Sequence, residues 1–174
     1  MPVDVMTAIR TRRSVRRFSP EEVPDDLLRS VLEAAHWAPS AHNRQPWYFI
    51  VSREQEKREK IAQASTWAKF LPAAPVMILV CTRLDYKGGP TPQKMIEWFS
   101  IQSTAAAIQN LLLAAHSQGL ATCWIGDLNS ALLAELFTIP KGYEPVAIIA
   151  LGYPAAAVPG APPRRPLEDV ISWQ

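Results

Sequence analysis

Glycine is scarce in this sequence, with 7 residues in 174, whereas proline occurs 16 times. The few glycines form neither a G-x-G-x-x-G dinucleotide-binding turn nor a G-x-x-x-x-G-K-[ST] phosphate loop. In both motifs a glycine-rich turn lets backbone N–H groups approach a phosphate closely. If the protein binds a phosphorylated ligand, other groups must therefore hold the phosphate.

Cysteine and histidine are rare as well. Cys81 and Cys123 are the only cysteines, and both lie in apolar stretches far apart in the sequence. Such a pair forms neither a disulfide framework nor a metal-ligand spacing, which favours a reducing, cytoplasmic location. The histidines at positions 36, 42 and 116 show no ligand spacing. We therefore predict no metal site and interpret both cysteines as core residues.

Long apolar runs are missing too, since none approaches the roughly 20 residues of a membrane helix. The first residues lack the apolar stretch and the cleavage site of a signal peptide. The net charge of +2 is too small to indicate a nucleic-acid or membrane surface. The length predicts one domain over residues 1–174.

Hydrophobic patterns predict a mixture of helices and strands. Helices are expected over 3–10, 25–37, 54–63 and 131–137, strands over 47–51, 76–81, 121–125 and 146–151, and a loop over 85–93. The unbroken apolar run in the first strand predicts burial on both faces. Because helices and strands do not alternate strictly, we predict an α+β fold with a central mixed or antiparallel sheet flanked by helices.

The strongest periodic signal predicts a long helix that ends at Gly119. Apolar residues recur there at steps of four and three, at Ile101, Ala105, Ile108, Leu112 and Ala115. Because Leu111 and Leu113 add apolar groups on other sides, we expect this helix to be central and buried nearly all round.

The C-terminal segment 153–174 is expected to be an extended arm. Five prolines occur in residues 153–166 and exclude regular helix or ladder hydrogen bonds. Leu167, Val170, Ile171 and Trp173 follow, and all four favour burial. The arm could cross a partner subunit, or it could be a frayed tail; composition leaves both open.

Five arginines lie within eight residues near the N-terminus, at positions 10, 12, 13, 16 and 17. From composition alone, a solvated charge run is the simpler interpretation. A planar guanidinium, however, matches a phosphate bidentately, and Ser14 offers a hydroxyl within the cluster. Val15 and Phe18 can pin the segment to the core. We predict an anion site; a nucleic-acid patch competes, although the rest of the chain has no basic stripe.

Two other segments suit a heterocyclic ligand. Residues 38–47 form a polar, proline-bounded loop in which Asn43 and Gln45 offer both donors and acceptors. Gly126 follows the strand 121–125 and permits close approach of a ligand to the backbone. Each segment alone also fits an ordinary connection.

In this order, these segments resemble the nitroreductase family of flavoproteins. The likeness rests on RRSVRRF (12–18), APSAHNRQPW (38–47), ATCWIG (121–126), PKGY (140–143) with LGYP (151–154), and RRPLEDV (164–170). It implies an α+β homodimer that exchanges its C-terminal arms, with FMN at each end of the interface. It also implies that NADH or NADPH reduces nitroaromatic, quinone or similar planar acceptors by a ping-pong mechanism.

The resemblance implies roles for the matching residues. Arg12, Ser14 and Arg164 would hold the phosphate and ribityl chain of FMN, with Arg13 and Arg165 close by. Arg16 would face the pyrimidine end of the flavin, where its charge stabilises the reduced form. Three residues would line the ring from one subunit or the other, namely Pro39, Ser40 and Asn43. The backbone at Ile125 and Gly126 would face flavin N5, so no side chain need act as acid or base.

Two departures from the family pattern leave alternatives open. Pro162 and Pro163 stand where a further basic residue is common, so the phosphate would have fewer charges around it. Aromatic residues in 65–100 follow no pattern and could stack on a substrate or belong to the core: Trp67, Phe70, Tyr86, Trp98 and Phe99. Relatives that act on a deazaflavin cofactor, a halogenated aromatic or their own flavin are alternatives. A non-enzymatic anion- or nucleic-acid-binding module is the alternative of another class.

Overall fold

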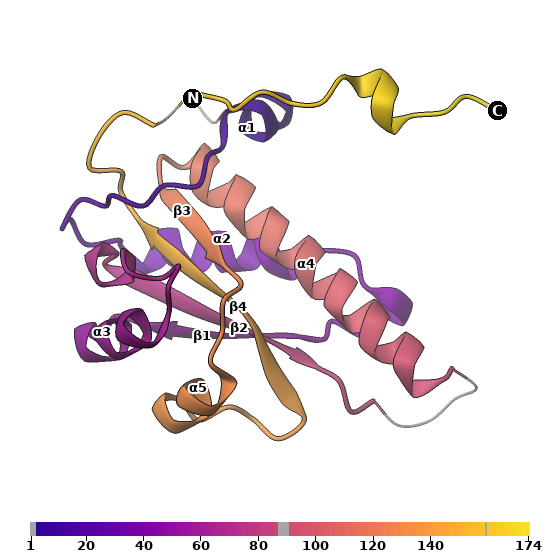
Figure 1. Ribbon diagram of the computed structural model, residues 1–174, viewed down its shortest axis with the longest axis horizontal. Helices are drawn as coiled ribbons and strands as arrows, with labels where there is room; N and C mark the ends of the chain where they lie inside the picture. The colour runs from indigo at the N-terminus through magenta and orange to yellow at the C-terminus, as the bar shows by residue number, and fades with distance from the viewer. Residues whose placement is uncertain (1–2, 87–90, 159) are drawn as a thin grey trace.

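A computed structural model of the protein describes residues 3–86, 91–158 and 160–174; residues 87–90 of the expected loop and Pro159 of the expected arm lie outside the described residues. The described chain forms a four-stranded sheet in the order β1-β2-β4-β3, with antiparallel neighbours (Figure 1). The strands are β1 (Trp47–Ser52), β2 (Val76–Arg83), β3 (Ala121–Ile125) and β4 (Tyr143–Gly152).

Both faces of the sheet are covered by helices. Successive side chains of β2 point to opposite faces, so they pack in two separate layers. Ile78 and Val80 pack with α2 (Asp25–His36) and α4 (Gln93–Ser117). Met77 and Leu79 pack against α3 (Gln55–Ala64), η2 (Leu71–Ala73) and α5 (Ser130–Leu136). The predicted α+β fold is therefore confirmed, with an antiparallel sheet.

The first strand is an edge strand, and the prediction of burial on both faces is wrong. β1 pairs only with β2, and Tyr48 and Val51 are 42% and 38% exposed. An unbroken apolar run looks the same in a central strand and in an edge strand, because the pattern does not reveal a missing neighbour. An open groove of about 1180 Å³ lies along β1 and α2, lined partly by Leu28, Leu32 and Phe49.

The long helix α4 begins well before the predicted stripe and is buried only in part. Ile108, Leu112 and Ala115 are buried as expected, but Ile101 is 47% exposed. The first half of α4 instead turns Ser100 and Thr104 inward, where Thr104 Oγ1 lies 2.8 Å from Thr82 Oγ1. The spacing of apolar residues therefore did not predict the inner face of this half of the helix, because polar residues occupy it. Gly119 ends the helix with a φ of +80°, as predicted.

The N-terminal segment lies along β3. It follows α1 (Val5–Thr11), which Asp4 caps by accepting hydrogen bonds from the N–H groups of Met6 and Thr7. Ser14 and Thr122 form a parallel bridge, and Val15 N donates to Thr122 O at 2.9 Å. Val15 and Phe18 are buried, which confirms that they pin the segment to the core.

The C-terminal segment leaves the sheet beyond β4. Every described residue from 155 to 174 is exposed, including the short turn η3 (Leu167–Val170). Figure 1 shows this yellow segment passing α1 and running out from the body of the molecule. Trp173 is 91% exposed in the single chain, so the apolar end of the segment packs on none of the sheet or helices.

Gly152 provides a test of the packing where β4 ends. A Cβ at this position would collide with the ring of Pro75 and press on Phe18. Overpacking of a close-packed interior costs about 1–3 kcal/mol. We expect Gly152→Ala to lower the free energy of unfolding by that amount in a urea titration. Gly126→Ala, where a Cβ meets nothing within 4 Å, is the matched control; equal stability of the two variants would contradict this packing.

Candidate functional site

Three arginines from the two ends of the chain, Arg12, Arg13 and Arg164, lie close enough for the charges of Arg13 and Arg164 to act on Arg12. The pKa of Arg12 is lowered chiefly by burial, and further by the charges of Arg13 and Arg164. None of the three forms an ion pair with a carboxylate within the described residues. Guanidinium groups held together without a counter-ion create a positive potential that favours an anion.

A cavity of about 120 Å³ opens beside this arginine cluster, lined among others by Arg12, Arg13, His116 and Thr122. His116 Nε2 lies 2.7 Å from Thr11 Oγ1. Burial, and then the charges of Arg12 and Arg13, lower the pKa of His116. The imidazole is therefore neutral near pH 7, and the arginines supply the charge. The place of His116 beside the arginines could not be predicted from the sequence, because its partner Thr11 is far away along the chain.

Arg13 also has a structural role. Its Nη1 donates to the carbonyls of Arg10 and Arg12 at 2.8 and 2.7 Å, at the end of α1. A cation near a helix C-terminus satisfies carbonyls that have no partner within the helix. Its Nε is buried without a partner in the described structure. Arg165, in contrast, donates to Asp169 O within the C-terminal segment.

Ser14 and Arg16 follow Arg12 and Arg13 in the segment that lies along β3. Burial raises the pKa of the Cys123 thiol, while Arg16, a hydrogen bond with Ser14 and Arg12 act in the opposite direction. Cys123 is buried and its thiol stays protonated, which supports the interpretation of Cys123 as a core residue. The bridge to β3 is parallel, so Arg16 lies nearer than Ser14 to the end of the strand. Arg16 also lies over the ring of Phe70, 5.8 Å from its centroid.

At the end of β3 the backbone is open to a ligand. Ile125 is 4% exposed, so its side chain belongs to the core and only its backbone could face a ligand. Gly126 is exposed, and nothing lies within 4 Å of the place a Cβ would take. Asp127 next to it accepts a hydrogen bond of 2.7 Å from Ser65. From Thr122 to Gly126 a strand spans roughly 13 Å, which separates the arginine cluster from this open backbone.

The loop that carries Pro39, Ser40 and Asn43 is strained. It contains the short turn η1 (Ala41–Asn43), and His42, Asn43 and Gln45 have φ values of +54°, +53° and +49°. Left-handed residues other than glycine are uncommon and cost about 1–3 kcal/mol each. The Ser40 hydroxyl accepts from Gln45 N at 3.0 Å, so it closes the loop, a role that the sequence did not reveal.

The structure does not bring this loop together with the arginine cluster in one chain. Ala41 N donates to Ser103 Oγ in the first half of α4, whereas Thr11 contacts His116 at the other end. The thirteen residue-to-residue steps from Ser103 to His116 correspond to roughly 20 Å of helix. Figure 1 shows α1 at this far end of α4. Pro39, Ser40 and Asn43 therefore form one group, and Arg12, Ser14, Arg16 and Gly126 form another.

The aromatic residues of the variable segment do not form a single core. Trp67 and Trp98 are 73% and 61% exposed, whereas Phe70, Tyr86 and Phe99 are partly buried. The two tryptophans are therefore surface residues of the single chain.

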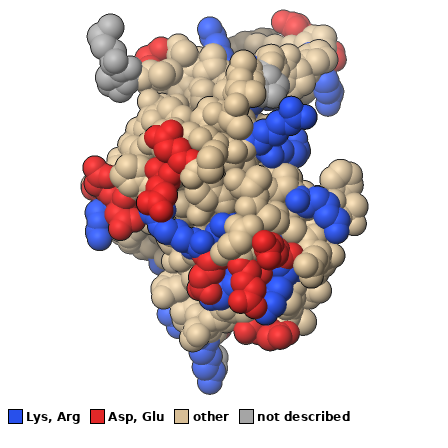
Figure 2. All heavy atoms as spheres, turned by 90° about the vertical axis from the view of Figure 1, so that its left-hand side faces the viewer, with Lys and Arg blue, Asp and Glu red and all other residues tan. Residues whose placement is uncertain are grey.

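Other kinds of site find no support in the described part of the chain. It has no group of three or more His, Cys, Asp or Glu residues that could hold a metal ion. None of its helices is both long and apolar enough to cross a membrane. On the face that Figure 2 shows, acidic and basic side chains are interspersed and form no continuous basic stripe.

Comparisons with known proteins agree on one family. The sequence model of the nitroreductase family matches residues 9–69 and 65–153. A Methanothermobacter thermautotrophicus protein named NADH dehydrogenase/NAD(P)H nitroreductase is 40% identical over 157 residues, covering 88% of this chain and 78% of the relative. The FMN reductase [NAD(P)H] of Bacillus subtilis is 28% identical, covering 96% and 72%. The crystal structure of a Desulfovibrio desulfuricans nitroreductase in complex with FMN is 34% identical, with a TM-score of 0.84 and coverage of 100% and 98%.

Proposed function

This chain belongs to the nitroreductase family, and we propose that it is an FMN-dependent oxidoreductase that uses NADH or NADPH to reduce small planar acceptors. Nitroaromatics and quinones are the acceptor classes we favour. The observation that carries the proposal is the meeting of Arg12, Arg13 and Arg164 without a counter-ion. The FMN-bound relative, with a TM-score of 0.84, supports the choice of cofactor.

The arginine cluster fits a terminal phosphomonoester. Arg12 and Arg164 would donate to the phosphate, and the exposed Ser14 hydroxyl would bind the phosphate or the ribityl chain next to it. Arg13 lines the same cavity and Arg165 follows Arg164 in the chain. A doubly charged phosphate would relieve the repulsion among the guanidinium groups. This fit favours FMN over a flavin whose phosphates are internal.

The flavin ring would lie along the end of β3. When bound, FMN supplies an N5 atom that can accept a hydride from the nicotinamide. The open backbone at Ile125 and Gly126 would direct an N–H group toward this atom. Arg16 is exposed and without a carboxylate partner in the described structure. Its fixed charge would face the pyrimidine end, where negative charge develops on reduction.

The second half of the ring site would come from another copy of the chain. Because about 20 Å separates the two groups along α4, we propose a homodimer in which Pro39, Ser40 and Asn43 face the flavin of the partner. Exposed apolar residues of α1 support an interface, with Val5, Met6 and Ile9 each at least half exposed. The partner's C-terminal arm would then cover the groove beside β1.

Donor and acceptor would use the same site in turn, which gives a ping-pong cycle. The motive is that both would react at flavin N5, beside the open backbone of Gly126. Anaerobic stopped-flow mixing with NADH or NADPH should bleach the yellow protein, and double-reciprocal plots at several acceptor concentrations should be parallel. In Gly126→Ala the added methyl group would stand between the backbone and the ring, so we expect the bleaching rate to fall about tenfold or more, the effect of about 1.4 kcal/mol.

The structure makes Gly126→Ala a clean variant, since the added Cβ meets no neighbouring atom within 4 Å. Its unfolding curve should match that of the unsubstituted protein. A flavin that neither NADH nor NADPH bleaches would overturn the oxidoreductase proposal. Normal bleaching in Gly126→Ala would instead overturn only the position of the ring.

A further inference from the structure

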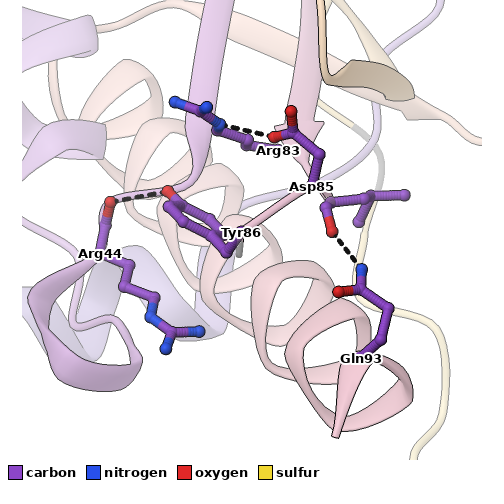
Figure 3. Close-up of polar contacts among 6 residues, drawn as sticks. Arg44, Arg83, Asp85, Tyr86 and Gln93 are labelled. Carbon is purple, nitrogen blue, oxygen red and sulfur yellow. Dashed lines mark hydrogen bonds and ion pairs between the residues drawn. The ribbon is translucent and has the colours of Figure 1, made fainter. Parts of the chain in front are cut away.

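The strained loop that carries Asn43 is held from outside by Tyr86. The phenol oxygen of Tyr86 donates to the carbonyl of Arg44 at 3.0 Å. Figure 3 shows Tyr86 reaching this carbonyl at the end of the loop, with the Arg44 side chain turned away from the bond. Arg44 lies between Asn43 and Gln45, two of the three left-handed residues. The bond therefore holds the loop at its strained backbone.

Tyr86 is itself held rigidly. Its ring lies between two guanidinium groups, 5.2 Å from Arg44 Cζ and 5.3 Å from Arg83 Cζ. Arg83 is fixed by a 2.7 Å ion pair with Asp85 (Figure 3) and by its N–H bond to Pro46 O. Leu84 N donates to Gly142 O, which ties the segment to the start of β4. The phenol group thus links the backbone of the loop to a segment that is held against the sheet.

The backbone of the loop has other partners. Ala41 N donates to Ser103 Oγ in α4, and Pro46 O accepts from Arg83 N in β2, so both bonds lie outside residues 43–45. Within those residues the other bonds stay inside the loop. Asn43 N and Arg44 N donate to the carbonyls of Ser40 and Ala41, and Gln45 Nε2 donates to Asn43 O. Among the described residues, the bond from Tyr86 is therefore the one hydrogen bond that reaches the backbone of residues 43–45 from outside the loop. Burial and Tyr143 raise the pKa of Tyr86, against the charges of Arg83 and Arg44, so the phenol remains a donor throughout the neutral pH range.

We propose that Tyr86 is a positioning residue, which through the Arg44 carbonyl orients Asn43 toward the flavin ring of the partner subunit. This inference rests on the proposed function, since it takes Asn43 as a ring-lining residue. It predicts that one O–H group affects the rate of flavin reduction without touching the cofactor.

Tyr86→Phe tests the inference because it removes the O–H group and keeps the ring between both guanidinium groups. We expect the rate of flavin reduction in the FMN-loaded protein to fall about five- to tenfold, the effect of one hydrogen bond. The FMN content should not change, because the phosphate cluster lies elsewhere. Tyr143→Phe is the matched control: its ring also lies near Arg83, but within the described residues its hydroxyl makes no bond to the loop. Its rate should stay within about twofold.

A double-mutant cycle separates positioning from a general structural effect. If Tyr86 acts through Asn43, Tyr86→Phe should have no further effect on the rate in an Asn43→Ala background. Additive effects, or an unchanged rate with a lower melting temperature, would overturn the inference.

Hydrogen exchange in the apo-protein provides a readout that does not depend on the cofactor. Amides of residues 41–45 should exchange several times faster in Tyr86→Phe and should be unchanged in Tyr143→Phe. Unchanged exchange in Tyr86→Phe would also overturn the inference. Failure of the wild-type flavin to bleach would contradict the proposed function instead, and the exchange experiment would still report on the loop.

Discussion

Replacing Arg12 and Arg164 together by alanine should weaken FMN binding by about two orders of magnitude or more. Each charged hydrogen bond contributes about 1.5–3 kcal/mol, and about 1.4 kcal/mol corresponds to a tenfold change in affinity. The charge of Arg164 lowers the pKa of Arg12, so the two side chains interact and the effects of the single substitutions need not add. Titration of the apo-protein with FMN, followed by the quenching of flavin fluorescence, measures the loss.

A matched ligand and a matched variant make this result specific to the phosphate. Riboflavin lacks the phosphate, so its affinity should be low and nearly the same in the unsubstituted and doubly substituted proteins. Arg17→Ala removes an exposed arginine from the same segment and should bind FMN normally. Full FMN occupancy in the Arg12→Ala, Arg164→Ala protein would refute the assignment of the phosphate site.

Most of the fold could be predicted because its elements carry local patterns. The strand Ala121–Ile125 has the predicted limits. α2 ends one residue before its predicted limit, and both ends of α3 lie one residue later than predicted. The two errors, on the burial of β1 and on the burial of α4, share a cause. The exposure of Tyr48 in β1 depends on which strand lies beside it, and the exposure of Ile101 depends on which side of α4 meets the sheet. Neither fact is encoded within a window of a few residues.

The candidate site could be predicted as a set of residues but not as a geometry. The order of the motifs identified Arg12, Ser14, Gly126 and Asn43, because each stands in a short recognisable segment. The distance between the groups, however, arises from the length of α4, and the use of the Ser40 hydroxyl within its own loop arises from left-handed backbone at Gln45. The bond of Tyr86 to the loop could not be predicted, because its segment follows no family pattern and its partner Arg44 lies 42 positions earlier.

Mixed dimers should restore activity from two inactive variants if the ring site is shared between subunits. Arg12→Ala impairs the residues proposed to bind the phosphate, and Asn43→Ala impairs the loop. In a dimer of one Arg12→Ala chain and one Asn43→Ala chain, one site receives both substitutions and the other receives neither, provided that each loop serves the partner's flavin. Two different affinity tags allow purification of the mixed dimer, which should show about half the activity of the unsubstituted protein, one intact site of two.

A second pair of variants distinguishes this outcome from a general effect of mixing. Arg12 and Gly126 belong to the same group along β3, so a mixed dimer of Arg12→Ala and Gly126→Ala chains has one substitution in each site and should show no recovery of activity. If the loop and the phosphate-binding residues of one chain served the same flavin, the Arg12→Ala and Asn43→Ala pair would also have one substitution in each site. Activity in neither mixed dimer would then refute the shared site. Because about 20 Å of α4 separates Ser103 beside the loop from His116 beside Arg12, we expect activity to return only when Arg12→Ala is combined with Asn43→Ala.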